Sequence, residues 1–233
     1  MLFSRDDVAE FVNANFEPVW VMVRPVPIVK IDFGNGKVLT RTLHGNIMTS
    51  VCTSDGQLLD ALPGIYTPEV YIDRLNQFRL LARTVRQQPP QDQAAWVKAY
   101  HTRAAEAIKA NQEPERFVEA VRVAPVGKAR IERPTEKILA GPNGAVPQPP
   151  KGPPVAPPAV AGWKELAEDT QLNESTRRRQ IHELLAATGP VAPEKVLRPI
   201  YKDVLHADLD DPYLGLGKTL FENYPFAEED ARK

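Results

Sequence analysis

The chain has 233 residues, of which 42% are hydrophobic, and its formal net charge is −1 at pH 7. This length accommodates one large domain or two small ones, and the low net charge argues against a broad electrostatic surface for nucleic acid or an anionic membrane. The single cysteine, Cys52, can form neither a disulfide within the chain nor a thiolate zinc site by itself. We therefore expect no cofactor, no nucleic-acid partner and no membrane contact.

The beginning of the chain, MLFSRDDVAEFVNANF, has no apolar stretch behind a positively charged start, so no secretory signal is visible. No run approaches the ~18 apolar residues that a helix needs to span a bilayer. The sequence as given predicts a soluble, cytoplasmic protein. A signal segment upstream of Met1 would instead make it periplasmic or secreted.

The first predicted elements are a helix, a strand and a hairpin. Residues 5–16 carry apolar side chains at helical spacing behind two acidic residues, and the apolar run VWVMVR (19–24) predicts a strand covered on both faces. Residues 28–43 alternate around Asn35-Gly36, which favours a hairpin with a two-residue type I′ turn.

A second hairpin is predicted over residues 47–62, around Asp55-Gly56. Thr67 then stands at a helix N-cap with Pro68 in the first turn, where proline's missing amide is harmless. The buried stripe of this helix is predicted to contain Tyr71, Leu75, Phe78, Ala82 and Val85.

Residues 91–111 predict another helix. The amino-acid composition then changes to a proline-rich segment that includes PPKGPP. Such a segment buries too little surface to offset its ordering entropy, so we expect an extended linker; an SH3-type ligand is the alternative. The predicted divisions are an α/β domain at 1–132, a linker at 133–162 and a helical C-terminal segment at 163–233.

Helices return after the linker. Asn173 is predicted to cap a helix that ends at Gly189-Pro190, and residues 193–205 predict a helix broken at Pro199. Their apolar stripes are too small for an independent core, so they either fold back on the first domain or dock on another protein.

The order of elements over residues 5–86 resembles the thioredoxin-like superfamily. Gly45, Asp55-Gly56 and Gly64 stand where that family has a glycine before its last hairpin, the hairpin turn, and the glycine leading into the last helix. The resemblance implies an α/β fold with a thioredoxin-like mixed sheet flanked by helices.

Three departures from the family pattern bear on chemistry. The CxxC motif of the family precedes the first helix and is missing here, the cis-proline position falls near Ile47 or Met48, and the FGNG hairpin (33–36) stands where the family has helix. Thiol–disulfide exchange needs an attacking and a resolving thiol, so the resemblance implies a redox-inactive member.

Two residues remain weak catalytic candidates. Cys52 lies inside a predicted strand without a cationic neighbour, so we expect a buried, unreactive thiol, with a sensor or nucleophile as the alternative. His44 precedes Gly45 at a strand end and could act as a general base, although a surface histidine is the simpler interpretation.

Other motifs predict little chemistry. His206, Asp208 and Asp210 in HADLDD are weak candidates for a metal site, while IHELL lacks the second histidine of the zinc-protease motif. The arginine run 177–179 predicts a solvated face or a partner contact.

The function we predict is that of a binding or scaffolding module with a protein partner, whose recognition surface includes the loop Leu62, Pro63, Gly64, Ile65 and Tyr66. The alternative is a thiol-redox or antioxidant component that uses Cys52 or a CxxC supplied upstream. A metal-dependent hydrolase around His206 is a weaker alternative.

Overall fold

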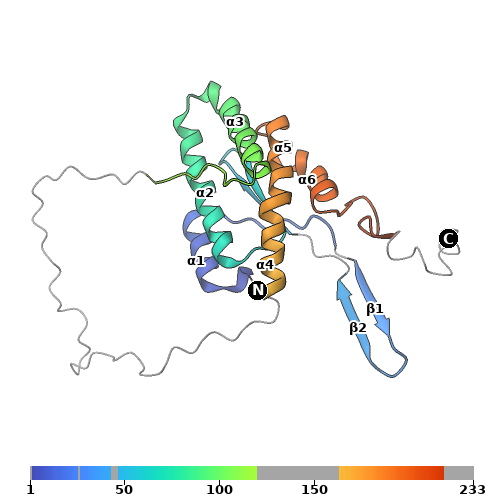
Figure 1. Ribbon diagram of the computed structural model, residues 1–233. Coiled ribbons are helices and arrows are strands. Elements are labelled where there is room, and N and C mark those ends of the chain that lie inside the picture. The colour runs from blue at the N-terminus through green and yellow to red at the C-terminus, as the bar shows by residue number, and fades with distance from the viewer. Residues whose placement is uncertain (1, 26, 43–46, 120–162, 218–233) are drawn as a thin grey trace, which may run out of the picture.

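A computed structural model describes residues 2–25, 27–42, 47–119 and 163–217 (Figure 1). Over these residues the fold mixes helices with two separate two-stranded antiparallel sheets. In chain order the elements are α1 (Asp6–Asn15), β1 (Ile28–Asp32), β2 (Val38–Thr42), β3 (Met48–Cys52), β4 (Leu58–Pro63), α2 (Pro68–Gln87), α3 (Pro90–Lys109), α4 (Trp163–Leu172), α5 (Arg178–Thr188) and α6 (Pro193–Pro199). In these ranges no helix is long and apolar enough to cross a membrane.

Strand β4 is the centre of the body, and every one of its residues is buried. On one side Leu62 packs with residues of α1 and α2, and Leu59 packs with residues of α2 and α3. On the other, Leu58 and Ala61 pack with residues of α5 and α6. A strand that is buried on both faces usually has a continuous apolar sequence. The sequence of β4, LLDALP, is of this kind apart from one aspartate.

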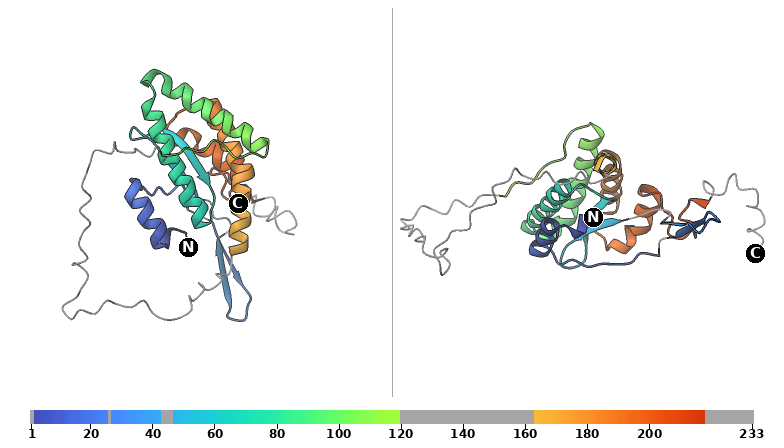
Figure 2. Two further views of the ribbon diagram at one scale, coloured as in Figure 1. Left: turned by 60° about the vertical axis from the view of Figure 1, so that its left-hand side comes forward. Right: turned by 90° about the horizontal axis from the view of Figure 1, so that it is seen from below.

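The C-terminal helices therefore fold back on the N-terminal part of the chain, one of the two arrangements expected from their apolar stripes. Ile181, Leu185, Val196 and Ile200 complete the core cluster that Leu58 and Ala61 begin. Helix α5 also lies along α3, as both figures of the whole chain show (Figures 1 and 2).

Several elements confirm the sequence prediction. The helices at 6–15, 68–87 and 90–109 are present, and the second hairpin turns at Asp55-Gly56, where Gly56 has a φ of +81°. Pro68 occupies the first turn of α2, whereas the Thr67 side chain makes no capping hydrogen bond. The backbone amide of Thr67 donates instead to Thr170 Oγ1 at 2.9 Å.

The predicted strand at 19–24 is wrong. These residues form no strand, and Val19, Trp20, Val21 and Met22 face outward, Trp20 at 79% exposure. An apolar run becomes a buried strand only where neighbouring strands pair with it. Among the described residues, β1 pairs only with β2 and β3 only with β4.

The turn of the first hairpin also differs from the prediction. Positive φ values occur at Gly34 and Gly36, and the amide of Phe33 donates to the Lys37 carbonyl at 3.2 Å. Residues 34–36 therefore form a three-residue loop. The two left-handed residues of this loop are Gly34 and Gly36, and not Asn35 and Gly36 as a two-residue turn would require.

Asn173 does not cap a helix, which is a further correction. Helix α4 continues through a π-helical turn, η2 (Asn173–Arg177), directly into α5. The Asn173 side chain donates to the Ile65 carbonyl at 2.8 Å, so its polar group serves a contact between segments. The helix does end at Gly189, with a φ of +74°, and α6 changes to a π-helical turn, η3 (Ile200–Val204), after Pro199. The proline-rich linker 133–162 lies outside the described residues.

Candidate functional site

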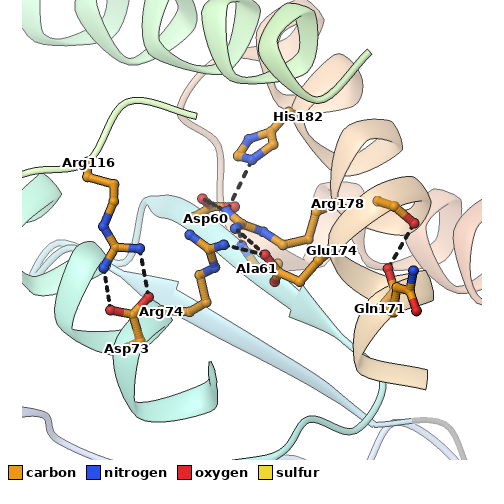
Figure 3. Close-up of polar contacts among 10 residues, drawn as sticks. Asp60, Ala61, Asp73, Arg74, Arg116, Gln171, Glu174, Arg178 and His182 are labelled. Carbon is orange, nitrogen blue, oxygen red and sulfur yellow. Dashed lines mark hydrogen bonds and ion pairs between the residues drawn. The ribbon is translucent and has the colours of Figure 1, made fainter. Parts of the chain in front are cut away.

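Four buried polar side chains meet where β4, α3 and α5 come together. They are Asp60 of β4, His101 of α3, and Arg178 and His182 of α5, and we call them the buried polar centre (Figure 3 draws three of them). Arg178 and His182 are four residues apart and so lie on the same face of α5. The centre thus joins one strand of the N-terminal part to a helix that follows more than a hundred residues later.

An ion pair holds the centre together. Arg178 Nη2 donates to Asp60 Oδ2 at 3.1 Å, and the amide of Ala61 donates to Asp60 Oδ1 at 2.8 Å. Both ionised side chains are almost fully removed from water. A buried pair of this kind tolerates burial only because each charge meets its partner and further hydrogen bonds.

The two histidines extend the pair into a chain with one direction. Arg178 can only donate, so His182 Nε2, 3.1 Å from Arg178 Nη2, must accept. His182 therefore carries its proton on Nδ1, which donates to His101 Nδ1 at 2.8 Å. His101 in turn donates through Nε2 to the Leu59 carbonyl at 2.9 Å. Every ring nitrogen is satisfied when both imidazoles are neutral.

Burial keeps the histidines in that neutral state. Removal from water lowers the pKa of His182 to about 3 and also lowers the pKa of His101. Burial opposes ionisation of Asp60, but the charge of Arg178 and the hydrogen bond from the Ala61 amide outweigh it and hold the pKa of Asp60 below its ordinary value. The centre is consequently one ion pair and two neutral rings at pH 7.

A second ion pair adjoins the centre. Arg74 of α2 contacts Glu174 of η2 at 2.6 Å, and Glu174 also approaches Arg178 at 3.6 Å. Arg74, Glu174, Arg178 and Asp60 thus alternate in charge across the contact between α2, α5 and β4 (Figure 3). Glu174 Oε1 and Tyr66 Oη are buried and have no hydrogen-bond partner within the described ranges, so this end keeps unused bonding capacity.

Asp60, His101 and His182 have the donor atoms of a metal site, and these atoms lie within 4.8 Å of one another. A divalent ion bound by all three residues would have to break hydrogen bonds that the ring nitrogens already make. It would also lie beside the guanidinium of Arg178, which already contacts both Asp60 and His182. A fixed positive charge in that position disfavours a cation, so the centre fits a structural ion pair and not a metal ion.

Sequence reasoning missed this centre. The arginine run was expected on a solvated face or in a partner contact. For Arg178 this is wrong, because Arg178 is buried against Asp60 of the same chain, whereas its neighbour Arg179 does pair with Glu183 on the surface. Two signals were present: an aspartate within the apolar run LLDALP, and an arginine and a histidine four residues apart on the helix face that also carries Ile181 and Leu185. Neither signal identifies its partner, because the pairing crosses 118 positions of sequence.

The predicted catalytic candidates do not form a site in the described structure. Cys52 ends β3 and is exposed, which corrects the expectation of a buried thiol. Partial burial and the carboxylate of Glu194 raise the pKa of Cys52, the opposite of the shift that activates a cysteine. His44 lies outside the described residues.

The loop expected to offer a recognition surface is largely covered by the chain itself. Leu62, Pro63 and Tyr66 are buried, Gly64 is partly buried, and only Ile65 is exposed. The side chain of Asn173 approaches this loop: it bonds the Ile65 carbonyl, and a Cβ built on Gly64 would lie 3.1 Å from its amide.

The HADLDD residues are engaged with basic side chains. Asp208 pairs with Lys202 at 2.8 Å, Asp210 pairs with Arg198, and His206 is exposed. Among described residues, the cluster of Asp60, His101 and His182 is the one whose donor atoms converge, so His206, Asp208 and Asp210 are not brought together as ligands.

Among the described residues, most of the exposed large apolar side chains lie on the first hairpin and the segment before it. The hairpin β1–β2, which we call the arm, projects away from the body (Figures 1 and 2). Ile28, Ile31, Phe33 and Val38 are exposed on it, Phe33 at 60%. The exposed segment Val19–Met22 precedes the arm. Exposed apolar patches of this kind mark interaction sites.

Comparison of the chain with protein-family models, with curated proteins and with solved structures finds no match.

Proposed function

We propose that this protein is a redox-inactive binding or scaffolding module that recognises a protein partner through the arm. The observation that carries the proposal is the arm itself: within the described part of the chain its two strands pair only with each other, and they display apolar side chains to solvent. An isolated two-stranded hairpin is marginally stable in water. A partner that covers its apolar face or extends its free edges would stabilise it.

The chemistry of the single thiol supports the redox-inactive part. A chain with one cysteine cannot cycle between a dithiol and an internal disulfide. Because partial burial raises the pKa of Cys52, its thiolate fraction at neutral pH is below that of a free cysteine. Exposure of Cys52 keeps one alternative open, a mixed disulfide with another chain.

The finer proposal is a thioredoxin-like relationship. Its support is the succession of β3, β4 and α2, a hairpin with an aspartate–glycine turn followed by a helix that packs on it through Tyr71, Leu75 and Phe78. These residues account for only part of such a fold, so this proposal rests on the local unit.

Selection from a random peptide library on immobilised protein tests the binding function. We expect arm-dependent peptides, enriched on the wild type and lost on Ile31→Asp/Phe33→Asp. The control is Asp6→Ala/Asp7→Ala, on the exposed start of α1. Equal enrichment on wild type and arm variant would refute recognition by the arm, and turnover of insulin disulfides above background would refute redox inactivity.

A further inference from the structure

The outer edge of β1 has no neighbouring strand within the described ranges. Backbone groups along an antiparallel strand point alternately toward the paired strand and away from it. The amide of Phe33 donates to the Lys37 carbonyl at 3.2 Å, so the backbone groups of odd-numbered residues face β2. Those of Ile28, Lys30 and Asp32 therefore face the open edge, and such an edge is a template for a further strand.

The side chains along this edge carry opposite charges two residues apart. Lys30 and Asp32 are both exposed, and they lie on one face of the arm because side chains alternate along a strand. Ile31 lies between them in sequence and points to the opposite face. The amide of Gly34 donates to Asp32 Oδ1 at 2.8 Å, which holds this carboxylate at the end of the strand.

The positions of these two charges select one way for β1 to pair with β1 of a second copy. Outward-facing backbone groups of two antiparallel β1 strands meet only when even-numbered residues stand opposite even-numbered residues. Registers centred on Lys30, Ile31 and Asp32 meet this condition and keep most of the strand paired. The first sets Lys30 opposite itself and the last sets Asp32 opposite itself, and like charges directly opposite each other are unfavourable. The register centred on Ile31 sets Lys30 of each copy opposite Asp32 of the other.

We infer that two copies of this chain pair antiparallel through β1, in the register centred on Ile31, and so join their arms into one continuous sheet. The inference rests on the proposed function, because it names the partner of the arm as a second copy. Two-fold symmetry repeats the match between Lys30 and Asp32, and each such pair exchanges both backbone hydrogen bonds. A second copy is favoured over an unrelated protein because β1 carries both halves of the match. Strand β2 contains no acidic residue, so its edge offers no charge pair of this kind.

The shape of the molecule accommodates this pairing. The arm projects away from the body (Figure 1), and β1 runs from the body toward the turn. Antiparallel pairing sets the turn of one arm beside the base of the other, so the two bodies lie at opposite ends of the joint sheet. On the face opposite the charges, Ile31 then meets Ile31, and Val29 meets Phe33. The exposed apolar side chains of both arms thereby form one surface.

Sedimentation equilibrium of the full chain, up to millimolar concentration, tests the inference. We expect a weak dimer for the wild type, because the contact is short. Lys30→Asp and Asp32→Lys should each raise the dimer dissociation constant by about tenfold or more, since each sets like charges opposite each other at both symmetry-related pairs. The double variant Lys30→Asp/Asp32→Lys restores opposite charges and should dimerise like the wild type. An equimolar mixture of the two single variants should form a heterodimer for the same reason.

The matched control is Lys37→Asp, which makes the same charge reversal in the turn and should leave the dissociation constant unchanged. Asp32→Lys also removes the acceptor of the Gly34 amide. The double variant lacks this acceptor too, so its recovery reports charge pairing and not the turn. Should Asp32→Lys fail to fold, as measured by circular dichroism, Lys30→Asp carries the test, because it leaves the turn intact.

A wild type that stays monomeric at millimolar concentration overturns the inference. Unchanged dimerisation of Lys30→Asp also overturns it, and so does a folded double variant that dimerises no better than the single variants. The peptide selection decides the proposed function separately, because it alters Ile31 and Phe33 on the face opposite the two charges. Arm-dependent peptides on a monomeric wild type would leave the proposed function standing without this inference. A charge-dependent dimer that selects no such peptide would support the pairing and refute recognition of other partners.

Discussion

Replacing Arg178 with methionine should destabilise this protein more than any change on the surrounding helix surface. Methionine keeps most of the length and the apolar stem, but it removes the donor that reaches Asp60 and His182, both at 3.1 Å. Asp60, fully buried, would then be a charge without a partner. Breaking one side of a buried pair costs about 3–5 kcal/mol, a large share of the roughly 5–15 kcal/mol that stabilises a typical domain.

Urea unfolding followed by circular dichroism measures this loss. With a slope of about 1–3 kcal/mol per molar urea, the midpoint should fall by roughly 2 M. Arg179→Met is the matched control, since Arg179 is the next residue on the same helix and pairs with Glu183 near the surface. An exposed pair is worth about 1 kcal/mol or less, so that midpoint should hardly move.

A double variant separates the lost charge pair from lost packing. Asp60→Asn added to Arg178→Met removes the orphan charge while keeping an oxygen for the Ala61 amide, and it should recover part of the stability. Should the single variant fail to fold, recovery of a folded state in the double variant carries the same information. If Arg178→Met costs no more than Arg179→Met, the buried ion pair is not present and the reasoning is refuted.

Three further outcomes follow from the structure. The pKa of His182 is about 3 in the folded chain, against 6.5 for the ordinary group, so below pH 6.5 the unfolded chain binds a proton that the folded chain does not. The free energy of unfolding should therefore fall by about 2 kcal/mol between pH 8 and pH 5. Urea midpoints that stay flat over this range would contradict this prediction. The Cys52 thiol should react with a disulfide reagent at pH 7.5 more slowly than a free cysteine peptide, since partial burial raises its pKa; an equal or faster rate would count against this. Gly64→Ala should lower the stability of the fold more than Gly36→Ala. Both positions have a positive φ, so alanine adds about 1–3 kcal/mol of backbone strain at either one, but only at Gly64 would the new Cβ meet a side chain, that of Asn173 at 3.1 Å. Equal losses in thermal unfolding would show that the loop and the π-helical turn are not in contact.

Much of the secondary structure could be predicted because its signals are local. A proline in the first turn of a helix, a glycine at a hairpin turn and apolar residues at helical spacing act within a few residues. These signals placed α2 and the second hairpin correctly. The strand predicted at 19–24 is absent because an apolar run indicates a tendency to be buried, but it does not indicate whether a neighbouring strand is available to pair with it.

The buried polar centre could not be predicted because its members are ordinary when considered one at a time. An arginine in RRR is normally solvated, and the histidine of IHELL drew attention only as an incomplete metal motif. What distinguishes Arg178 and His182 is the aspartate that β4 presents to them, and that neighbour is a product of the fold. A charged residue inside a buried strand is the one sequence feature that requires such a partner.

The buried polar centre stabilises the body, and the arm, the proposed recognition surface, lies outside that body. The hydrogen bonds from Arg178 through His182 and His101 to the Leu59 carbonyl run in one direction and satisfy every ring nitrogen. A shift of α5 along β4 would leave buried donors or acceptors unpaired, and that cost selects one placement of the helix. Within the residues that the structure describes, the arm contributes no side chain to the four buried core clusters. The packing of the body therefore does not explain the exposed apolar side chains of the arm. They would be explained if another segment or another protein covers them.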